Sequence, residues 1–177
     1  MNYYAVTAML ARVYCWAGEY GNAYKEAKEV VDATYSTGST STASCFNFSN
    51  SLTTNRKDYN SIIMTFFKST CYEDYLPYMT KGNDVVLVVN TTNLFGDEAG
   101  ADDRNLDLFG DWDGGDIKYS FKYDIKEGTS GTDMIPAIRL SEMYYIMGEY
   151  FAYKDEFSKA GEMLDKVRYA RGISTTN

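Results

Sequence analysis

The stretch Met134-Ile-Pro-Ala-Ile-Arg-Leu-Ser-Glu-Met-Tyr-Tyr-Ile-Met-Gly-Glu-Tyr150 decides the fold, because part of it repeats a stretch near the N-terminus. Leu10-Ala-Arg-Val-Tyr14-x-x-x-Gly18-Glu-Tyr20 returns 130 residues later as Leu140-Ser-Glu-Met-Tyr144-x-x-x-Gly148-Glu-Tyr150. The segments that follow align 137 residues apart instead, Tyr20 with Phe157 and Ala23 with Ala160. Each copy is typical of two helices joined by a tight turn, and the change of offset predicts a first helix two turns longer in the later copy.

The spacing of apolar residues supports the same two helical hairpins. From Tyr3 to Ala17 they recur at helical spacing, and Gly18 and Gly21 then interrupt the run. Alanines four apart in the next segment let two helices approach closely. We therefore expect one helical hairpin over residues 3 to 34 and a second over residues 134 to 172, packed as two antiparallel pairs.

The insertion between the hairpins, residues 35 to 133, has a different character. Its Ser/Thr-rich start, Tyr35 to Thr54, predicts a loop, whereas Asp84 to Asn90 and Ile117 to Tyr123 are typical of strands that form a small sheet. Asn60 to Met79 predicts one or two short helices. The expected fold is mainly α, a single domain over residues 1 to 177, with tetratricopeptide-like hairpins and a loop-rich insertion that contains a small β element.

Composition excludes several classes of function. A net charge of −8 and a pI near 4.6 disfavour nucleic acid as a partner. The absence of histidine excludes Ser-His-Asp and Cys-His catalysis within this chain and removes the commonest transition-metal ligand. The three cysteines, Cys15, Cys45 and Cys71, lack any C-x-x-C spacing and predict neither a zinc site nor a disulfide framework. No cofactor is expected.

Targeting segments are also missing from this sequence. No apolar run reaches the 18 residues of a transmembrane helix, and neither a signal peptide nor a lipid-attachment cysteine is recognisable. We therefore expect no direct membrane insertion by this chain.

The segments from Met134 to Tyr150 and from Leu164 to Gly172 resemble the SusD/RagB family, the ligand-capturing lipoproteins of Bacteroidetes outer-membrane nutrient importers. The residues that carry the resemblance recur at fixed offsets: Pro136, Ile138, Arg139, Glu142, Val167, Arg168, Ala170, Arg171 and Gly172. Asp102-Asp103-Arg104 is similar to the Asp-Pro-Arg element of that family with the proline replaced. Family members are longer at both ends, so the resemblance implies a core fragment or a shortened homologue.

The resemblance implies a SusD-like helical superhelix and a non-catalytic function. It implies capture of a glycan at the cell surface of the outer membrane and delivery to a SusC-like, TonB-dependent transporter, without bond cleavage. Related proteins take peptides instead, and the sequence does not identify the ligand. The alternative is a tetratricopeptide-like adaptor whose ligand is another protein. The first function predicts exposed aromatic residues in a concave site, and the second predicts exposed apolar area on the helical hairpins.

Candidate ligand-binding residues lie in the insertion. Trp112, flanked by Asp111 and Asp113, offers a stacking face and hydrogen-bond acceptors for sugar hydroxyls. Tyr72, Tyr75 and Tyr78 recur every three residues and form either a second stacking platform or part of a core.

Other polar residues receive different interpretations. Asp107, Asp111, Asp113 and Asp116 are interpreted as a solvated acidic loop, because the glycines and Lys122 do not fit an EF-hand calcium site. Arg139, Glu142 and Arg168 are interpreted as structural residues that fasten helices, with the first two treated as a pair three apart on one helix.

Overall fold

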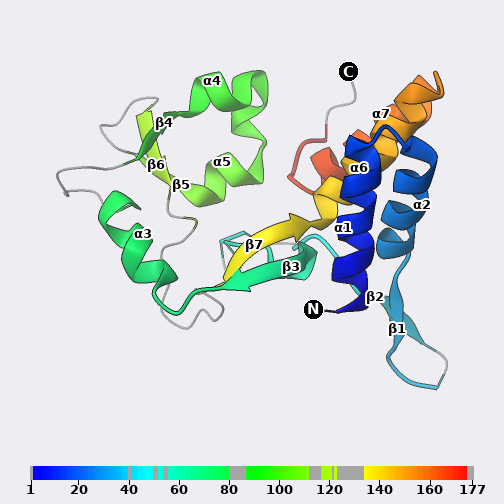
Figure 1. Cartoon of the computed structure of the whole chain (residues 1–177). Helices are drawn as coiled ribbons and strands as arrows, with labels where there is room; N and C mark the ends of the chain where they lie inside the picture. Colours follow the sequence, from blue (N-terminus) through cyan, green and yellow to red (C-terminus); the bar gives the residue numbers. More distant parts are fainter. Residues whose placement is uncertain are drawn as a thin grey trace. The chain divides into compact units, whose positions relative to one another are not determined.

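The computed structural model describes residues 2–39, 41–49, 52–53, 56–79, 87–111, 117–120, 122 and 134–174 (Figure 1). The chain divides into two compact units, which are described separately. The helical unit comprises Met1–Phe48, Asn60–Thr65 and Pro136–Arg168, and the mixed unit comprises Ser49–Tyr59, Phe66–Ile135 and Tyr169–Asn177. The expected fold class, mainly α with tetratricopeptide-like hairpins and small β elements, is confirmed. The expectation of a single domain stays a prediction.

The helical unit is built from α1 (Tyr3–Trp16), α2 (Tyr20–Val31), α6 (Leu140–Tyr153) and α7 (Phe157–Tyr169), the last of which ends at the boundary of the unit. The side chain of Asn2 caps α1 by accepting a hydrogen bond from the amide of Ala5 at 2.8 Å. Helix α2 packs against both α1 and α6. The core joins small residues of the first hairpin to large residues of α6: Ala8, Ala11, Ala23, Ala27, Val30, Met143, Ile146 and Met147.

The two hairpins correspond at an offset of 137 throughout, and the prediction of a longer first helix in the second copy was wrong. Helices α1 and α6 have 14 residues each, and their bounds differ by 137 at both ends. The turns correspond as well, because Gly18 and Asp155 both have positive φ angles, +75° and +58°. The residues shared at an offset of 130 therefore do not correspond in the fold. Leu10 lies two turns further along its helix than Leu140 does. Gly18 lies in the turn after α1, whereas Gly148 lies inside α6.

Residues Met134–Arg139, expected at the start of the second helical hairpin, form strand β7. Pro136 lacks the amide hydrogen that a helix interior needs and disfavours helical geometry at Ile135. The following β-branched Ile138 also favours extended backbone. Helix α6 therefore begins only at Leu140, with Arg139 as its N-cap residue.

Two further corrections concern the start of the insertion. The segment expected to be a loop contains a hairpin of β1 (Thr34–Ser36) and β2 (Thr42–Ser44), which pair antiparallel with Tyr35 opposite Ala43. In the segment expected to be helical, Ile62–Phe67 forms β3, which pairs with β7, while Cys71–Met79 forms the expected helix, α3. Adjacent isoleucines and phenylalanines favour a strand over a short helix.

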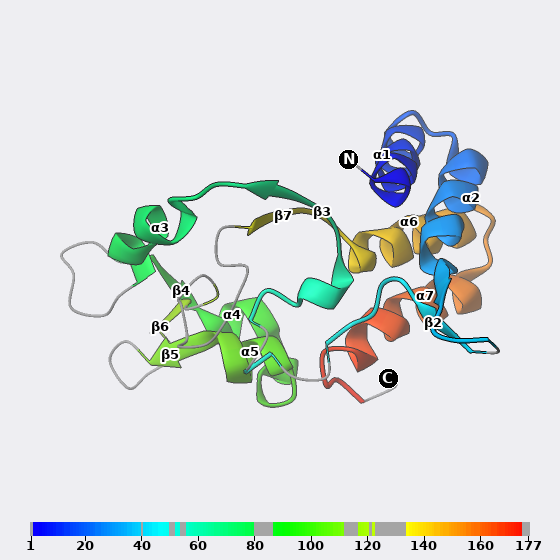
Figure 2. The ribbon, with the colours of Figure 1, turned by 90° about the horizontal axis from the view of Figure 1, so that it is seen from below.

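The mixed unit contains the small sheet that the sequence predicts (Figure 2). Strands β4 (Val88–Asn90) and β6 (Ile117–Ser120) pair antiparallel, and β5 (Phe109–Asp111) adds to the other edge of β6. Two short helices lie between β4 and β5 in the chain, α4 (Thr91–Phe95) and α5 (Asp103–Leu108), separated by a 3-10 helix over Gly96–Gly100. The side chains of Asn90 and Asp102 cap these helices.

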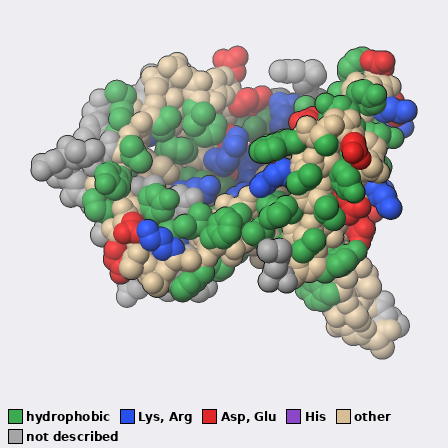
Figure 3. Space-filling model, in the orientation of Figure 1, with side chains coloured by type: hydrophobic (Ala, Val, Ile, Leu, Met, Phe, Trp, Pro, Cys, Tyr) green, Lys and Arg blue, Asp and Glu red, His purple; other side chains and the backbone are tan. Residues whose placement is uncertain are grey.

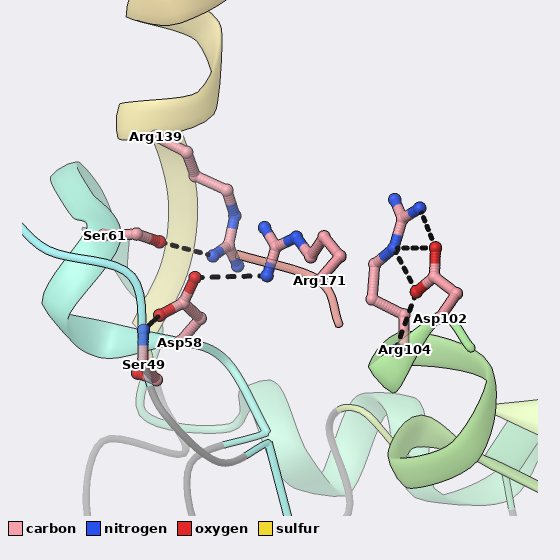
Figure 4. A network of polar contacts seen from close by, with 7 residues as sticks. All are labelled: Ser49, Asp58, Ser61, Asp102, Arg104, Arg139 and Arg171. Atoms are coloured by element: carbon pink, nitrogen blue, oxygen red, sulfur yellow. Dashed lines mark hydrogen bonds and ion pairs between the residues drawn. The ribbon is translucent and has the colours of Figure 1, made fainter. Parts of the chain in front are cut away.

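The C-terminal segment completes the mixed unit. The amide of Asp103 donates to the carbonyl of Arg171 at 2.8 Å, and Gly172 lies directly against Ala101 and Asp103. The guanidinium of Arg171 reaches the buried carboxylate of Asp58 at 3.3 Å (Figure 4). The segments Asp102-Asp103-Arg104 and Arg171-Gly172, both singled out by the resemblance, are therefore neighbours in the fold.

Candidate functional site

A cavity of about 270 Å³ lies in the mixed unit beside the three-stranded sheet. Its walls come from α4, α5, β5 and the end of β6, and they combine two aromatic rings with three polar side chains. The lining residues are Leu94, Phe95, Arg104, Leu108, Phe109, Ser120 and Lys122. Apolar walls with a few polar groups are typical of small-ligand sites.

Two phenylalanines form the aromatic part of the cavity. The ring centroids of Phe95 and Phe109 are 5.9 Å apart, and the rings meet edge to face at 75°. The guanidinium carbon of Arg104 lies 5.4 Å from the centroid of Phe95, within the range of a cation–π contact. Both rings are half-buried, and Leu108, which lines the same cavity, is buried.

Asp102 fixes the position of Arg104. Its carboxylate is 1% exposed and accepts hydrogen bonds from Nε of Arg104 at 2.9 Å and from Nη2 at 2.5 Å (Figure 4). The same carboxylate caps α5 by accepting the amide of Arg104 at 2.9 Å. One buried acid therefore both starts the helix and holds the arginine that lines the cavity.

The predicted site residue Asp111 lies on the same face of the sheet as this cavity. Phe109 is paired with Ser120, and Asp111 with Lys118. Because side chains alternate along a strand, Phe109 and Asp111 share one face, together with Ser120 and Lys118. The carboxylate of Asp111 is 4.0 Å from the ammonium of Lys118. This face thus presents an aromatic ring, a hydroxyl and an ion pair in two adjacent rows.

The remaining predicted ligand-binding residues are less fully described. Trp112 and Asp113 follow Asp111 directly and lie outside the described residues. Tyr72 and Tyr75 lie on α3, as the spacing of three predicts for a helix; Tyr75 is half-buried, and the side chain of Tyr72 is outside the description. Their roles as ligand contacts stay predictions.

The residues interpreted as structural have partners other than those expected. Glu142 binds Arg12 of α1, with Nε of Arg12 at 2.5 Å and Nη2 at 2.7 Å from the two carboxylate oxygens. Nη1 of Arg139 reaches the hydroxyl of Ser61 at 3.5 Å (Figure 4). Arg168 pairs with Asp165 on its own helix at 3.2 Å. The expectation that Arg139 and Glu142 sit three apart on one helix was wrong, since Arg139 precedes α6.

Sequence reasoning missed Phe95, Arg104 as a lining residue, Phe109 and Ser120. Phe95 and Phe109 are 14 positions apart, in a helix and a strand, so no short-range pattern unites them. Arg104 was noticed only as part of the Asp-x-Arg element. The one available signal was the predicted strand from Ile117 to Tyr123, whose alternation places Lys118 and Ser120 on one face. The strand that carries Phe109 was not predicted.

The described part of the chain offers neither a metal-ligating cluster nor a membrane-spanning helix. No group of three or more His, Cys, Asp or Glu side chains there is placed to hold a metal ion. No helix there combines the length and apolar composition needed to span a membrane.

Comparison with known proteins relates this chain to solved structures only. No family model and no curated protein matches the sequence. A Bacteroides vulgatus protein described as sugar-binding matches with a TM-score of 0.68 and 22% identity over 99% of this chain and 40% of its own. A SusD superfamily protein of Bacteroides thetaiotaomicron matches with a TM-score of 0.67 and 22% identity over 97% of this chain and 42% of its own.

A second Bacteroides vulgatus protein, described as a SusD-like carbohydrate-binding protein, matches with a TM-score of 0.62 and 19% identity over all of this chain and 38% of its own. These similarities confirm that the chain has a SusD-like fold. The chain spans about two fifths of the length of the structures it matches.

Proposed function

We propose that this chain binds a glycan without cleaving it, at the cavity of the mixed unit and the segment that begins at Trp112. The observation that carries the proposal is the pairing of the Phe95 and Phe109 rings beside Arg104, which Asp102 holds in place. Aromatic rings accept the C–H faces of a sugar, and a fixed guanidinium donates hydrogen bonds to its hydroxyls. Two of the three structures with a similar fold are described as sugar-binding or carbohydrate-binding proteins.

The composition of the cavity supports binding over hydrolysis. Glycoside hydrolysis generally uses two carboxyl groups that flank the scissile bond. The described lining residues include no carboxylate, and Asp102 is committed to Arg104 and to the start of α5. The cavity therefore offers shape, stacking surface and donors for binding.

The proposed cellular location and the proposed protein partner both follow from the resemblance to the SusD/RagB family. We propose that the ligand is captured at the cell surface of the outer membrane and delivered to a SusC-like, TonB-dependent transporter. Pull-down of a SusC-like transporter with this chain as bait, with and without the glycan, tests this part separately from ligand binding.

A glycan array identifies the ligand, and calorimetric titration of the full chain then locates the site. We expect saturable binding that Trp112→Ala abolishes and Phe109→Ala weakens at least tenfold. Trp16→Ala is the matched control, because Trp16 is an exposed tryptophan of α1 in the helical unit and should leave glycan affinity unchanged. Absence of binding to every glycan, or equal loss in the Trp16 variant, would show that the mixed unit is not a glycan site.

A further inference from the structure

The described walls of the cavity in the mixed unit carry ionisable side chains of one sign only. These are Arg104 and Lys122, both cationic, and the described lining includes no carboxylate. The chain as a whole has the opposite charge, −8, from 25 acidic and 17 basic side chains. Figure 3 shows Lys or Arg side chains next to hydrophobic ones in the region of α5. The described lining is therefore a locally basic surface in an acidic protein.

Arg104 presents the positive end of its ion pair to the cavity. Its partner Asp102 is 1% exposed and is not among the described lining residues, whereas the side chain of Arg104 is 45% exposed. The two hydrogen bonds from Nε and Nη2 to this carboxylate fix the direction of the pair. A ligand in the cavity therefore meets the guanidinium before the carboxylate. Guanidinium groups match the paired oxygens of carboxylates and similar oxyanions.

The end of β6 supplies a second polar wall. The hydroxyl of Ser120 accepts a hydrogen bond from the backbone amide of Lys122 at 3.3 Å. A hydroxyl that accepts one hydrogen bond can still donate its own hydrogen. Both residues are half-buried, and both line the cavity. This wall thus combines a positioned hydroxyl with the second cationic side chain of the lining.

The size and shape of the cavity suit one sugar residue. Its volume of about 270 Å³ lies just below the range of about 300–1,000 Å³ typical of sites for drug-sized ligands. The rings of Phe95 and Phe109 meet at 75° and form an aromatic corner. A sugar ring that packs against either phenylalanine has its substituents within the same small space as the two cationic side chains.

We propose that this cavity binds an anionic sugar residue of the glycan, one that carries a carboxylate or a sulfate group. The inference rests on the proposed function and narrows it from glycans in general to acidic glycans. The sugar ring packs on the aromatic corner, and its anionic group pairs with Arg104 and Lys122 and accepts the hydroxyl of Ser120. A neutral sugar forms only ordinary hydrogen bonds there, which are roughly half as strong as charge-assisted ones.

The described carboxylate on the same face of the sheet does not oppose this assignment. Asp111 lies two residues beyond Phe109, outside the described lining, and its carboxylate is 4.0 Å from the ammonium of Lys118. The two charges cancel at a distance. Salt at physiological strength screens what remains beyond about 8 Å.

Matched pairs of ligands test the preference with the full chain. A glycan array carries oligogalacturonate beside its methyl ester, and carrageenan oligosaccharides beside their desulfated forms. Calorimetric titration should then show that an acidic glycan binds at least tenfold more tightly than its neutral counterpart in 50 mM NaCl. The difference should shrink severalfold in 500 mM NaCl, because salt screens the ion pairs. The two pairs distinguish a carboxylate from a sulfate ligand.

A charge reversal locates the preference in the cavity. Lys122→Glu should lower the ratio of acidic to neutral affinity at least tenfold, and Lys122→Gln should lower it by less. Lys159→Glu is the matched control, because it changes the net charge equally but lies on α7 in the helical unit, and it should leave the ratio unchanged. Circular dichroism establishes that the variants are folded, and the salt dependence of the unsubstituted chain needs no variant.

The outcomes separate this inference from the proposed function. Binding of neutral glycans that is weakened by Phe109→Ala, without a preference for acidic ones, would overturn the inference and leave the proposed function standing. Equal effects of Lys122→Glu and Lys159→Glu would also overturn it, because the preference would then reflect net charge alone. Absence of binding to every glycan would overturn both.

Discussion

Gly172→Ala should strongly destabilise the mixed unit. Gly172 has a φ of +81°, and a Cβ built on it would lie 2.7 Å from Oδ1 of Asp103 and 2.8 Å from the carbonyl oxygen of Ala101. A left-handed conformation costs an L-residue about 1–2 kcal/mol. Crowding in a packed interior typically costs about 1–3 kcal/mol more. The backbone carbonyl cannot swing away as a side chain can, so we expect a total of about 2–5 kcal/mol.

Two other glycines separate these contributions. Gly18 has a φ of +75° with nothing within 4 Å of its Cβ position, so Gly18→Ala should cost only the conformational part, about 1–2 kcal/mol. Gly161 lies inside α7 with an equally open Cβ position, so Gly161→Ala should stabilise by about 0.5–1 kcal/mol.

Urea unfolding followed by circular dichroism measures all three variants. For a protein of this size, a loss of about 3 kcal/mol corresponds to a fall in Tm of roughly 6–12 °C. If Gly172→Ala costs no more than Gly18→Ala, the contact of the C-terminal segment with Ala101 and Asp103 does not stabilise the protein. The reasoning from close approach would then be refuted.

Three further predictions concern polar contacts. A double-mutant cycle of Arg12→Ala and Glu142→Ala, measured by urea unfolding, should give a coupling of about 1 kcal/mol, because both side chains are roughly 30% exposed; zero coupling would contradict this. Burial, then the hydrogen bond to Glu149, raises the pKa of the Cys15 thiol to about 12. Iodoacetamide labelling of Cys15, followed by mass spectrometry, should therefore be slow at pH 8 and accelerate about tenfold per pH unit beyond pH 9, and Glu149→Gln should speed it; levelling off near pH 9 would contradict the shift. Asp102→Ala should cost about 1–3 kcal/mol by removing the cap of α5 and the partner of Arg104, and Asp102→Asn less; equal losses in urea unfolding would mean that the charge alone matters.

The helical hairpins were predictable because their apolar spacing is sustained over more than three turns. The register between the two copies was predicted wrongly. Identical residues in the first helices suggested an offset of 130, whereas the correct offset of 137 was visible only in the second helices. Strand β7 was missed for a related reason: Met134 to Arg139 adjoins a strongly helical segment, and Pro136 was interpreted as part of a motif instead of a helix boundary. Short strands such as β1 and β2 carry too few residues for a periodic signal.

Only one wall of the candidate site was predictable from the sequence, the strand that carries Ser120, because β5 was not predicted. The pairing of β5 with β6 places Asp111 on the face of Phe109, so a residue chosen for its flanking of Trp112 lies beside the cavity. The edge-to-face pair of Phe95 and Phe109 depends on how α4 and α5 pack on the sheet. That packing is set by tertiary contacts, which local patterns do not encode.

The residues that carry the family resemblance account for the fold more directly than for a ligand. Within the mixed unit, Asp103 meets Arg171 through the backbone, and Gly172 fits against Ala101 because it has no side chain. In the helical unit, Glu142 joins the second hairpin to Arg12 of the first. The described lining of the cavity consists largely of other residues, and Arg104 is its one member that belongs to the resemblance. Proteins with the same motif can therefore share this fold while presenting different walls to their ligands.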